Sequence, residues 1–117
     1  MAKLAQLVDD VVATNFPLEG SEVRIGRRPD NDIQINESAV SGYHAHIEIA
    51  ENTDLGGVMD YFLVDDDSKN GTFINDVRVN GRQRLTNGDI VRIAFNRFQF
   101  IDESELGLEE TAYILEE

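Results

Sequence analysis

The stretch RIGRRPDNDIQINESAVSGYHAHIEI, residues 24–49, carries the pattern that decides the fold of this 117-residue chain. Apolar and polar residues alternate at its two ends and again at residues 33–35, which is the period of a β-strand. At its end, Ala45, Ile47 and Ile49 fall on one strand face. Pro, Asp, Asn, Ser and Gly, the residue types of turns, fill the segments between. The stretch therefore predicts short strands joined by two polar loops.

These two polar loops carry residue types that bind a phosphate. Arg27 follows the first predicted strand, and Ser41 comes shortly before the last one. We expect both loops to leave the same end of neighbouring strands. A guanidinium offers a charged pair of donors, and a hydroxyl with loop N–H groups offers further donors. The stretch therefore predicts a local anion site.

Short strands separated by turns continue along the chain as far as residue 102. No segment before that residue shows apolar residues at helical spacing over three turns, so no helix is predicted there. The Thr-Asn-Gly-Asp sequence at 86–89 predicts a β-hairpin. Many short strands with frequent turns are typical of a β-sandwich. The other predicted strands lie within residues 1–8, 11–18, 59–64, 72–74, 77–80, 82–85, 90–93 and 98–101.

The composition fits one small soluble domain. Hydrophobic residues make up 41% of the chain, which is enough for a single core. Because there is no cysteine, the sequence excludes a disulfide framework, a thiolate metal site and a cysteine nucleophile. The first residues show no long apolar run or cleavage-type signal, and nothing approaches a membrane span. We therefore expect a cytoplasmic protein that does not contact a membrane.

The net charge of −13 is concentrated at the C-terminal end of the sequence. Residues 102–117 hold 7 of the 23 acidic residues and no Lys or Arg. Residues 1–101 therefore carry 16 acidic against 10 basic residues, a net charge of −6. Such a balance repels nucleic acid and anionic lipid at long range. The cluster of Arg24, Arg27 and Arg28 still leaves room for a local anion site in an acidic protein.

Five short motifs, in their order and spacing, resemble the forkhead-associated (FHA) domains, a family that binds phosphothreonine peptides. The motifs are Gly26-Arg27, Asn31-Asp32-Ile33, Ser41-x-x-His44, Ser68-Lys69-Asn70-Gly71-Thr72-Phe73 and Asn87-Gly88-Asp89. The resemblance covers roughly residues 3–102. It implies an all-β fold, a twisted two-sheet antiparallel β-sandwich of about 11 strands with the ligand loops at one end. We expect an FHA domain at residues 1–102 and an acidic tail at 103–117.

The resemblance implies that Arg27 is the main phosphate anchor and that the hydroxyl of Ser41 donates to the phosphate. The alternative for Arg27 is a surface ion pair with Asp30 or Asp32. The alternative for Ser41 is a turn serine that bonds its own backbone. We expect the neighbouring Arg28 to be solvated or to raise the local positive potential.

The resemblance also assigns roles in the second binding loop. The family uses the Asn at the position of Asn70 to hold the peptide backbone, whereas the alternative is a left-handed turn residue before Gly71. Lys69 stands where the family often has Thr, and it is either an added phosphate contact or a solvated loop cation. Gly26, His44 and Gly71 are expected to support the loops structurally.

The sequence departs from the family pattern at Gly42, where a basic or polar side chain usually helps to bind the phosphate. The N–H of Gly42 can still face the phosphate, and Lys69 can compensate. Each charge-assisted hydrogen bond contributes about 1.5–3 kcal/mol, so an uncompensated loss weakens binding about tenfold or more. Ala39 lies in the loop that often reads the third residue after the phosphothreonine. Its small apolar side chain predicts an apolar preference there.

Neither catalysis nor metal binding is predicted. Ser41 and His44 lie close in sequence, but no Gly-x-Ser-x-Gly elbow accompanies them. His44 and His46 alone do not make a closed metal site, even with the Asp run at 65–67. That run also fails the EF-hand spacing, because its fifth position is Lys69 and its Gly falls at the seventh. We therefore expect no enzyme activity, no metal and no cofactor.

The tail at 103–117 has its own pattern. Leu108, Ala112 and Leu115 are spaced as on one face of a short helix, which is too short to be stable alone. Thr111 has acidic neighbours and Ile114 three residues later, which resembles an FHA ligand. Thr111 is therefore a candidate phosphorylation site through which the tail would bind its own domain or a second copy. The alternative is an ordinary tail threonine.

Together these patterns predict a module that recognises phosphothreonine in a partner protein, with a Ser/Thr kinase that writes the mark. The sequence predicts no nucleic-acid partner. The alternative is a degenerate FHA fold that acts as a phosphate-independent scaffold, and Gly42 is the residue that favours it.

Overall fold

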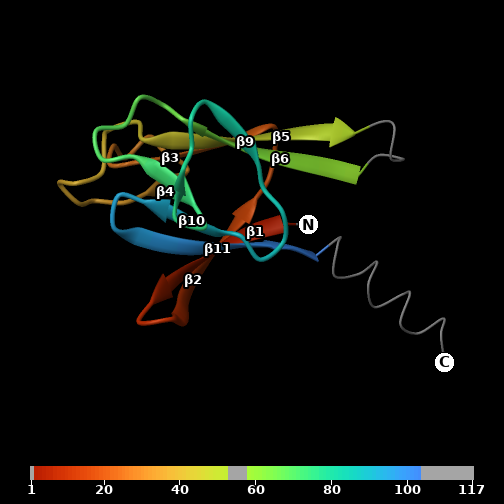
Figure 1. Ribbon diagram of the computed structural model, residues 1–117, viewed down its shortest axis with the longest axis horizontal. Helices are drawn as coiled ribbons and strands as arrows, with labels where there is room; N and C mark the ends of the chain where they lie inside the picture. The colour runs from red at the N-terminus through yellow and green to blue at the C-terminus, as the bar shows by residue number, and fades with distance from the viewer. Residues whose placement is uncertain (1, 53–57, 104–117) are drawn as a thin grey trace.

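The computed structural model describes residues 2–52 and 58–103, which form two packed β-sheets (Figure 1). The regular elements of these residues are strands, as the alternating pattern predicts. They are β1 (Ala2–Val8), β2 (Val11–Leu18), β3 (Glu22–Gly26), β4 (Ile33–Gln34), β5 (Ala45–Asn52), β6 (Val58–Asp65), β7 (Thr72–Ile74), β8 (Val77–Arg78), β9 (Arg82–Arg84), β10 (Ile90–Ile93) and β11 (Asn96–Asp102).

The strands divide into a six-stranded and a five-stranded sheet. The first has the order β2-β1-β11-β10-β7-β8, and the second has the order β4-β3-β5-β6-β9. Strand β11 pairs with both β1 and β10, so strands from the two ends of the described chain meet inside one sheet. The all-β sandwich expected from the sequence is thereby confirmed. The described residues contain no helix that is long and apolar enough to cross a membrane.

The core lies between the sheets because inward-facing apolar residues alternate with outward-facing ones. Val23, Ile47 and Leu63 are neighbours across β3, β5 and β6, and all three are buried. Phe98 and Phe100 of β11 join the same core and are fully buried. Burial of each such side chain stabilises the fold by about 1.5–3 kcal/mol.

One strand pair differs from the antiparallel arrangement predicted from the sequence, because β3 and β4 pair in parallel, with Ile25 opposite Ile33. Only two residues of β4 take part, and the chain returns to them through a short polar loop. The carboxylate of Asp32 accepts a hydrogen bond from the Arg24 N–H at 2.8 Å, next to the short pairing. The parallel pairing lets Ile33 be buried beside the equally buried Ile25.

The prediction of a β-hairpin at residues 86–89 is wrong. The turn joins β9 of the five-stranded sheet to β10 of the six-stranded sheet, and these two strands do not pair. The carboxylate of Asp89 accepts the Thr86 N–H at 2.8 Å, and the Gly88 N–H donates to the Phe100 carbonyl at 2.8 Å. The turn sequence is thus used to cross between layers and to dock on β11.

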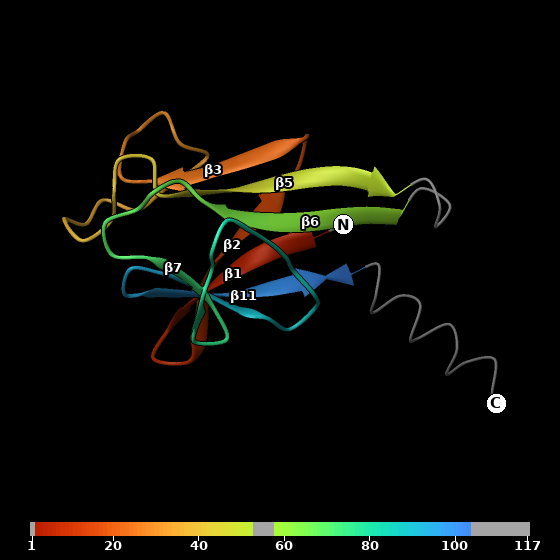
Figure 2. The same cartoon turned by 45° about the horizontal axis from the view of Figure 1, so that its top comes forward.

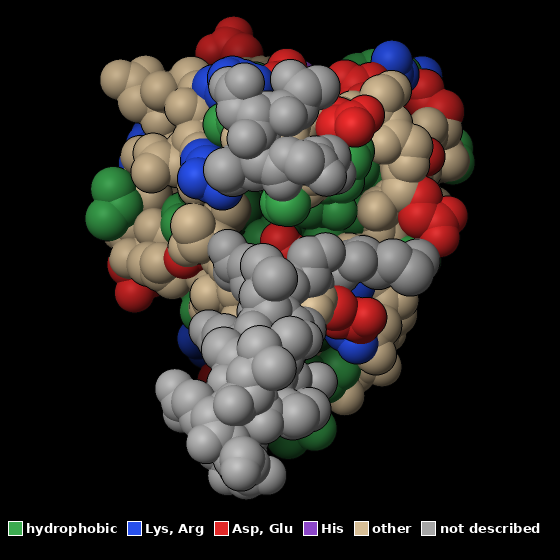
Figure 3. Space-filling view, turned by 90° about the vertical axis from the view of Figure 1, so that its right-hand side faces the viewer, with side chains coloured by type: hydrophobic (Ala, Val, Ile, Leu, Met, Phe, Trp, Pro, Cys, Tyr) green, Lys and Arg blue, Asp and Glu red, His purple; other side chains and the backbone are tan. Residues whose placement is uncertain are grey.

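Several loops gather at one end of the sandwich, on the left in Figures 1 and 2. We call this the loop end, and it consists of the β3–β4 loop (27–32), the β4–β5 loop (35–44), the β6–β7 loop (66–71) and the β10–β11 turn (94–95). At the opposite end, hydrophobic side chains show between the two layers, with charged side chains of both signs around them (Figure 3). Residues 53–57 and the tail from 104 onward lie outside the described residues. The domain boundary, the tail helix and the role of Thr111 therefore stay predictions.

Replacing Phe98 with Ala tests this core. Because Phe98 is fully buried, Phe98→Ala should lower the free energy of unfolding by about 3–5 kcal/mol in urea titrations. Val77, 70% exposed on β8, is the control, and Val77→Ala should change it by less than about 0.5 kcal/mol. Equal effects of the two substitutions would contradict the proposed core.

Candidate functional site

The β3–β4 loop is held close to the β4–β5 loop at Gly26. A Cβ at this position would lie only 2.3 Å from the Gly42 carbonyl oxygen and 2.8 Å from Nδ2 of Asn31. Asn31 is itself buried, and its Nδ2 donates to the carbonyls of Arg28 at 2.9 Å and Gly42 at 2.8 Å. Any side chain at residue 26 would therefore push the two loops apart. The structure thus gives a steric reason for Gly immediately before Arg27.

His44 connects the β4–β5 loop to the β6–β7 loop. Its ring is fully buried, and its Nδ1 accepts the Ser41 N–H at 3.1 Å. Its Nε2 lies 2.8 Å from the Gly71 carbonyl oxygen, so this nitrogen carries the hydrogen and donates it. Both ring nitrogens are occupied by backbone groups, which leaves neither available as a base for the Ser41 hydroxyl. This geometry gives no support to a Ser–His nucleophile.

Ser41, Lys69 and Asn70 are brought together by contacts between the same two loops. The Lys69 N–H donates to Oγ of Ser41 at 3.0 Å, and Nδ2 of Asn70 donates to the Ala39 carbonyl at 2.7 Å. Because the Ser41 oxygen acts as an acceptor here, its hydroxyl hydrogen remains free to donate to a ligand. The φ angle of Asn70 is not positive; the left-handed residues of this loop are Asp67 and Gly71. The turn-residue alternative for Asn70 therefore does not hold.

Arg27 is exposed at the loop end with its guanidinium unpaired among the described residues. Its backbone N–H donates to the Ser41 carbonyl at 3.0 Å, which fixes the residue beside the serine. The ion pairs considered from the sequence do not form: Asp30 pairs with Arg28 at 3.9 Å, and Asp32 accepts the Arg24 N–H. The charge of Arg27 is thus available to an incoming anion.

Asp30 is engaged by its neighbours rather than by Arg27. The Tyr43 hydroxyl donates to it at 2.6 Å, and this hydrogen bond, together with the charge of Arg28, lowers the pKa of Asp30. The Arg28 guanidinium also lies 5.6 Å from the centre of the Tyr43 ring. Arg28 is therefore partly neutralised, and it contributes positive potential beside Arg27 rather than a second free cation.

Gly42 contributes backbone groups to the site. Its carbonyl accepts from the Arg28 N–H at 3.2 Å and from Asn31, while its own N–H makes no hydrogen bond to the described residues. A Cβ at this position would meet only the flexible Arg28 side chain, at 3.1 Å. Packing therefore does not require glycine at position 42.

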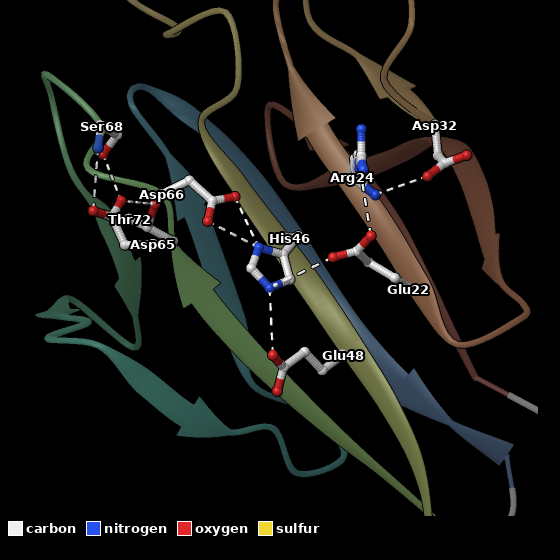
Figure 4. A network of polar contacts seen from close by, with 9 residues as sticks. All are labelled: Glu22, Arg24, Asp32, His46, Glu48, Asp65, Asp66, Ser68 and Thr72. Carbon is white, nitrogen blue, oxygen red and sulfur yellow. Dashed lines mark hydrogen bonds and ion pairs between the residues drawn. The ribbon is translucent and has the colours of Figure 1, made fainter.

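The carboxylate of Asp65 shapes the β6–β7 loop (Figure 4). It accepts the Ser68 N–H at 3.2 Å, the Ser68 hydroxyl at 2.5 Å and the Thr72 hydroxyl at 2.7 Å. Burial alone would raise the pKa of Asp65, but the hydrogen bonds from Ser68 and Thr72 lower it overall. The Ser68 oxygen in turn accepts the Gly71 N–H at 3.0 Å. Asp65 thereby closes the loop that carries Lys69 and Asn70.

His46 lies in a separate carboxylate cluster on the outer face of the five-stranded sheet (Figure 4). Its Nδ1 is 2.8 Å from Asp66, and its Nε2 is 3.5 Å from Glu48 and 3.7 Å from Glu22. Burial opposes the charged ring, but the hydrogen bond and charge of Asp66, aided by Glu48 and Glu22, raise the pKa of His46. Asp66 begins the β6–β7 loop, so the cluster anchors that loop to the sheet.

The two histidines do not share a site, because His44 bonds backbone groups while His46 faces carboxylates. Within residues 2–52 and 58–103, no group of three or more His, Asp or Glu side chains is arranged to hold a metal ion.

The structure also assigns supporting roles to Asn31 and Asp65 that the sequence analysis did not predict. The three-residue spacing of Asp65 and Ser68 is a local signal that would have indicated the second of these.

Three interlocked loops thus present Arg27, the Ser41 hydroxyl and the Gly42 N–H at one end of a β-sandwich, each with a donor that no described residue occupies. Hydrogen-bond donors of these kinds are the groups with which protein loops hold an anion. Residues 23–94 match the FHA domain family, and the chain belongs to that family. The resemblance seen in the sequence motifs is confirmed.

Relatives and solved structures support this assignment. The chain is 34% identical over 97 residues to the transcriptional regulatory protein EmbR of Mycobacterium tuberculosis, and 32% identical over 94 residues to the glycogen accumulation regulator GarA of the same organism. These matches cover 83% and 80% of this chain but only 23% and 53% of those proteins. The structure of M. tuberculosis EmbR in complex with a low-affinity phosphopeptide aligns with a TM-score of 0.72 at 32% identity. The aligned region covers 86% of this chain and 24% of the EmbR chain.

The raised pKa of His46 predicts that the stability of the protein depends on pH. A raised pKa means that the folded state holds the proton more tightly than the unfolded state, whose His titrates near about 6.5. This stabilisation is complete below that pH and is lost as pH rises through the higher pKa of the folded state. His46→Gln should therefore destabilise the protein more at pH 5.5 than at pH 8.5, as measured by urea unfolding.

Asp66→Asn serves as the matched variant, because it removes the nearest carboxylate and keeps the imidazole. It should reduce the same pH dependence. An effect of His46→Gln that is equal at both pH values, or larger at pH 8.5, would show that the cluster does not hold a proton preferentially in the folded state.

Proposed function

We propose that this FHA domain recognises phosphothreonine in a partner protein and acts in signalling or regulated assembly, not as an enzyme. The observation that carries the proposal is that Arg27, bonded through its backbone N–H to Ser41, has a guanidinium unpaired among the described residues, and that the Ser41 hydroxyl donates to none of them. The two neighbouring arginines, Arg24 and Arg28, already pair with carboxylates. Arg27 would bind the phosphate as a charged fork, and Ser41 with the Gly42 N–H would complete the set of donors.

The second loop would hold the peptide. Asn70 is fixed by its bond to the Ala39 carbonyl, and its side-chain oxygen makes no hydrogen bond to the described residues, so it can accept one from a peptide N–H. The ammonium of Lys69 pairs with no carboxylate of residues 2–52 and 58–103, and it would add charge next to the phosphate. The phosphopeptide in the EmbR structure supports this use of the fold.

The proposed partner is a protein phosphorylated on threonine, which requires a Ser/Thr kinase in the same compartment. We place that compartment in the cytoplasm. The net charge of −13 opposes binding to nucleic acid and to anionic membranes. Self-association through a phosphorylated Thr111 belongs to this proposal as a second use of the same site.

A second candidate is a scaffold that no longer depends on phosphate. It is favoured by Gly42, which supplies no side-chain donor where the family usually has one. Binding of an unphosphorylated partner, unaffected by salt, would support this candidate.

The first test is a titration of the full chain with a phosphothreonine peptide library and its unphosphorylated counterpart. Arg27→Ala should weaken phosphopeptide binding by about 10- to 100-fold, because it removes charge-assisted bonds of about 1.5–3 kcal/mol each. Arg97→Ala removes the same charge from β11, where Arg97 pairs with Asp10, and should leave the affinity nearly unchanged. Binding that is indifferent to both the phosphate and Arg27 would favour the scaffold.

A gain of affinity provides the complementary test. Since a Cβ at residue 42 meets only the flexible Arg28 side chain, Gly42→Ser should fold normally and add a hydroxyl donor. We expect phosphopeptide affinity to rise about tenfold, measured by calorimetry, with Gly42→Ala as the control that adds Cβ alone. No difference between the Ser and Ala variants would mean that the residue 42 side chain does not reach the phosphate.

A further inference from the structure

The β10–β11 turn presents an apolar side chain to solvent at the loop end. Phe95 is 76% exposed, the highest value among the large hydrophobic residues that the structure describes. The two residues before it, Ile93 and Ala94, are buried, so the turn is well packed although its tip is not. An exposed aromatic ring on an ordered turn next to a binding site is a typical interaction residue.

The turn is fixed by contacts with two of the three loops of the proposed phosphopeptide site, the β4–β5 and β6–β7 loops. The Ala94 N–H donates to the Gly71 carbonyl at 3.3 Å, and its carbonyl accepts from Nη1 of Arg92 at 2.8 Å. Nδ2 of Asn96 donates to the carboxylate of Glu37 in the β4–β5 loop at 3.1 Å. Phe95, between these two anchored residues, is therefore held in a defined position.

A continuous series of contacts leads from the phosphate side of the site to this turn. Arg27 bonds Ser41, whose hydroxyl oxygen accepts the Lys69 N–H; Gly71, two residues further along the loop, accepts the Ala94 N–H. The β10–β11 turn lies beside the other loops in both ribbon views (Figures 1 and 2). An extended peptide advances about 3.3 Å per residue, so residues two to four positions from the phosphothreonine would span about 7–13 Å. Because the β6–β7 loop that carries Lys69 also contacts the turn through Gly71, these flanking residues are the ones that we expect to reach it.

We propose that Phe95 contacts an apolar side chain of the phosphorylated partner, two to four residues from the phosphothreonine. This inference rests on the proposed function, and it adds a contact outside the three loops that hold the phosphate and the peptide backbone. The surroundings fit one kind of occupant. The Glu37 carboxylate, which accepts from Asn96 of the turn, repels an acidic residue, and Ala39 of the same β4–β5 loop is small and packs on the core. A Leu, Ile, Val or Phe side chain of the peptide carries no negative charge and can pack against an apolar surface.

The test uses the full chain and a phosphothreonine peptide library in which the flanking positions are varied. Wild type should select apolar residues at one flanking position, and Phe95→Ala should lose that preference. For the selected peptide, Phe95→Ala should weaken binding about tenfold, while the same peptide with Ala at that position should bind both proteins alike. Val77→Ala, at a residue of β8 that is 70% exposed, should change neither measurement.

The outcomes separate this inference from the proposed function. If Arg27→Ala abolishes binding but Phe95→Ala leaves the peptide preference intact, the Phe95 contact is wrong and phosphate recognition stands. If no peptide binds in a phosphate-dependent way, both fail. If Phe95→Ala instead lowers the molar mass in light scattering without affecting peptides, the turn is a contact between copies of this chain, and the inference is overturned. Far-UV circular dichroism and melting of each variant establish that it is folded.

Discussion

The buried ring of His44 is the constraint on which the loop end depends. It joins the Ser41 N–H to the Gly71 carbonyl through a single neutral imidazole, so the spacing of two loops is set by the width of one ring. Both bonded groups belong to loop backbone, which has no strand ladder to satisfy it. Losing the ring would leave the part-buried Ser41 N–H without this partner, at a cost of about 1–3 kcal/mol, and would leave the Gly71 carbonyl with only the Ala94 N–H. Stability and site geometry therefore rest on the same side chain.

The rest of the site is built by the same means, with polar side chains bonding the backbone of neighbouring loops. Asn31 holds the carbonyl of Gly42, Asp65 closes the β6–β7 loop, and Asn70 reaches the carbonyl of Ala39. These bonds leave the guanidinium of Arg27 and the hydroxyl hydrogen of Ser41 without partners in residues 2–52 and 58–103. Such a site is organised before its ligand arrives, which lowers the entropy cost of binding.

Local patterns in the sequence predicted most strands, because alternation and turn residues act over a few positions. The motif resemblance placed Arg27, Ser41, Lys69 and Asn70 on loops at one end, and the structure brings their loops together. The pairings that were not predicted depend on distant partners. The parallel β3–β4 pair and the crossing at 86–89 depend on which strands pair in each sheet. A short stretch of sequence does not contain that information. The proximity of Phe95 to Gly71 likewise follows from the order of β7, β10 and β11.

The pairing of β1 with β11, which sets Ala2 opposite Asp102, has a consequence for how the protein is made. Strand β11 lies between β1 and β10, so the six-stranded sheet cannot close until residue 102 has left the ribosome. At about 5–20 residues per second, the apolar face of β1 waits roughly 5–20 s for its partner. A two-stranded hairpin alone is marginally stable in water, so the β1–β2 hairpin does not secure that strand during the delay. The loops of the site are therefore synthesised well before the strand that completes the sheet. We expect the yield of folded protein to depend on translation speed and on early chaperone contact.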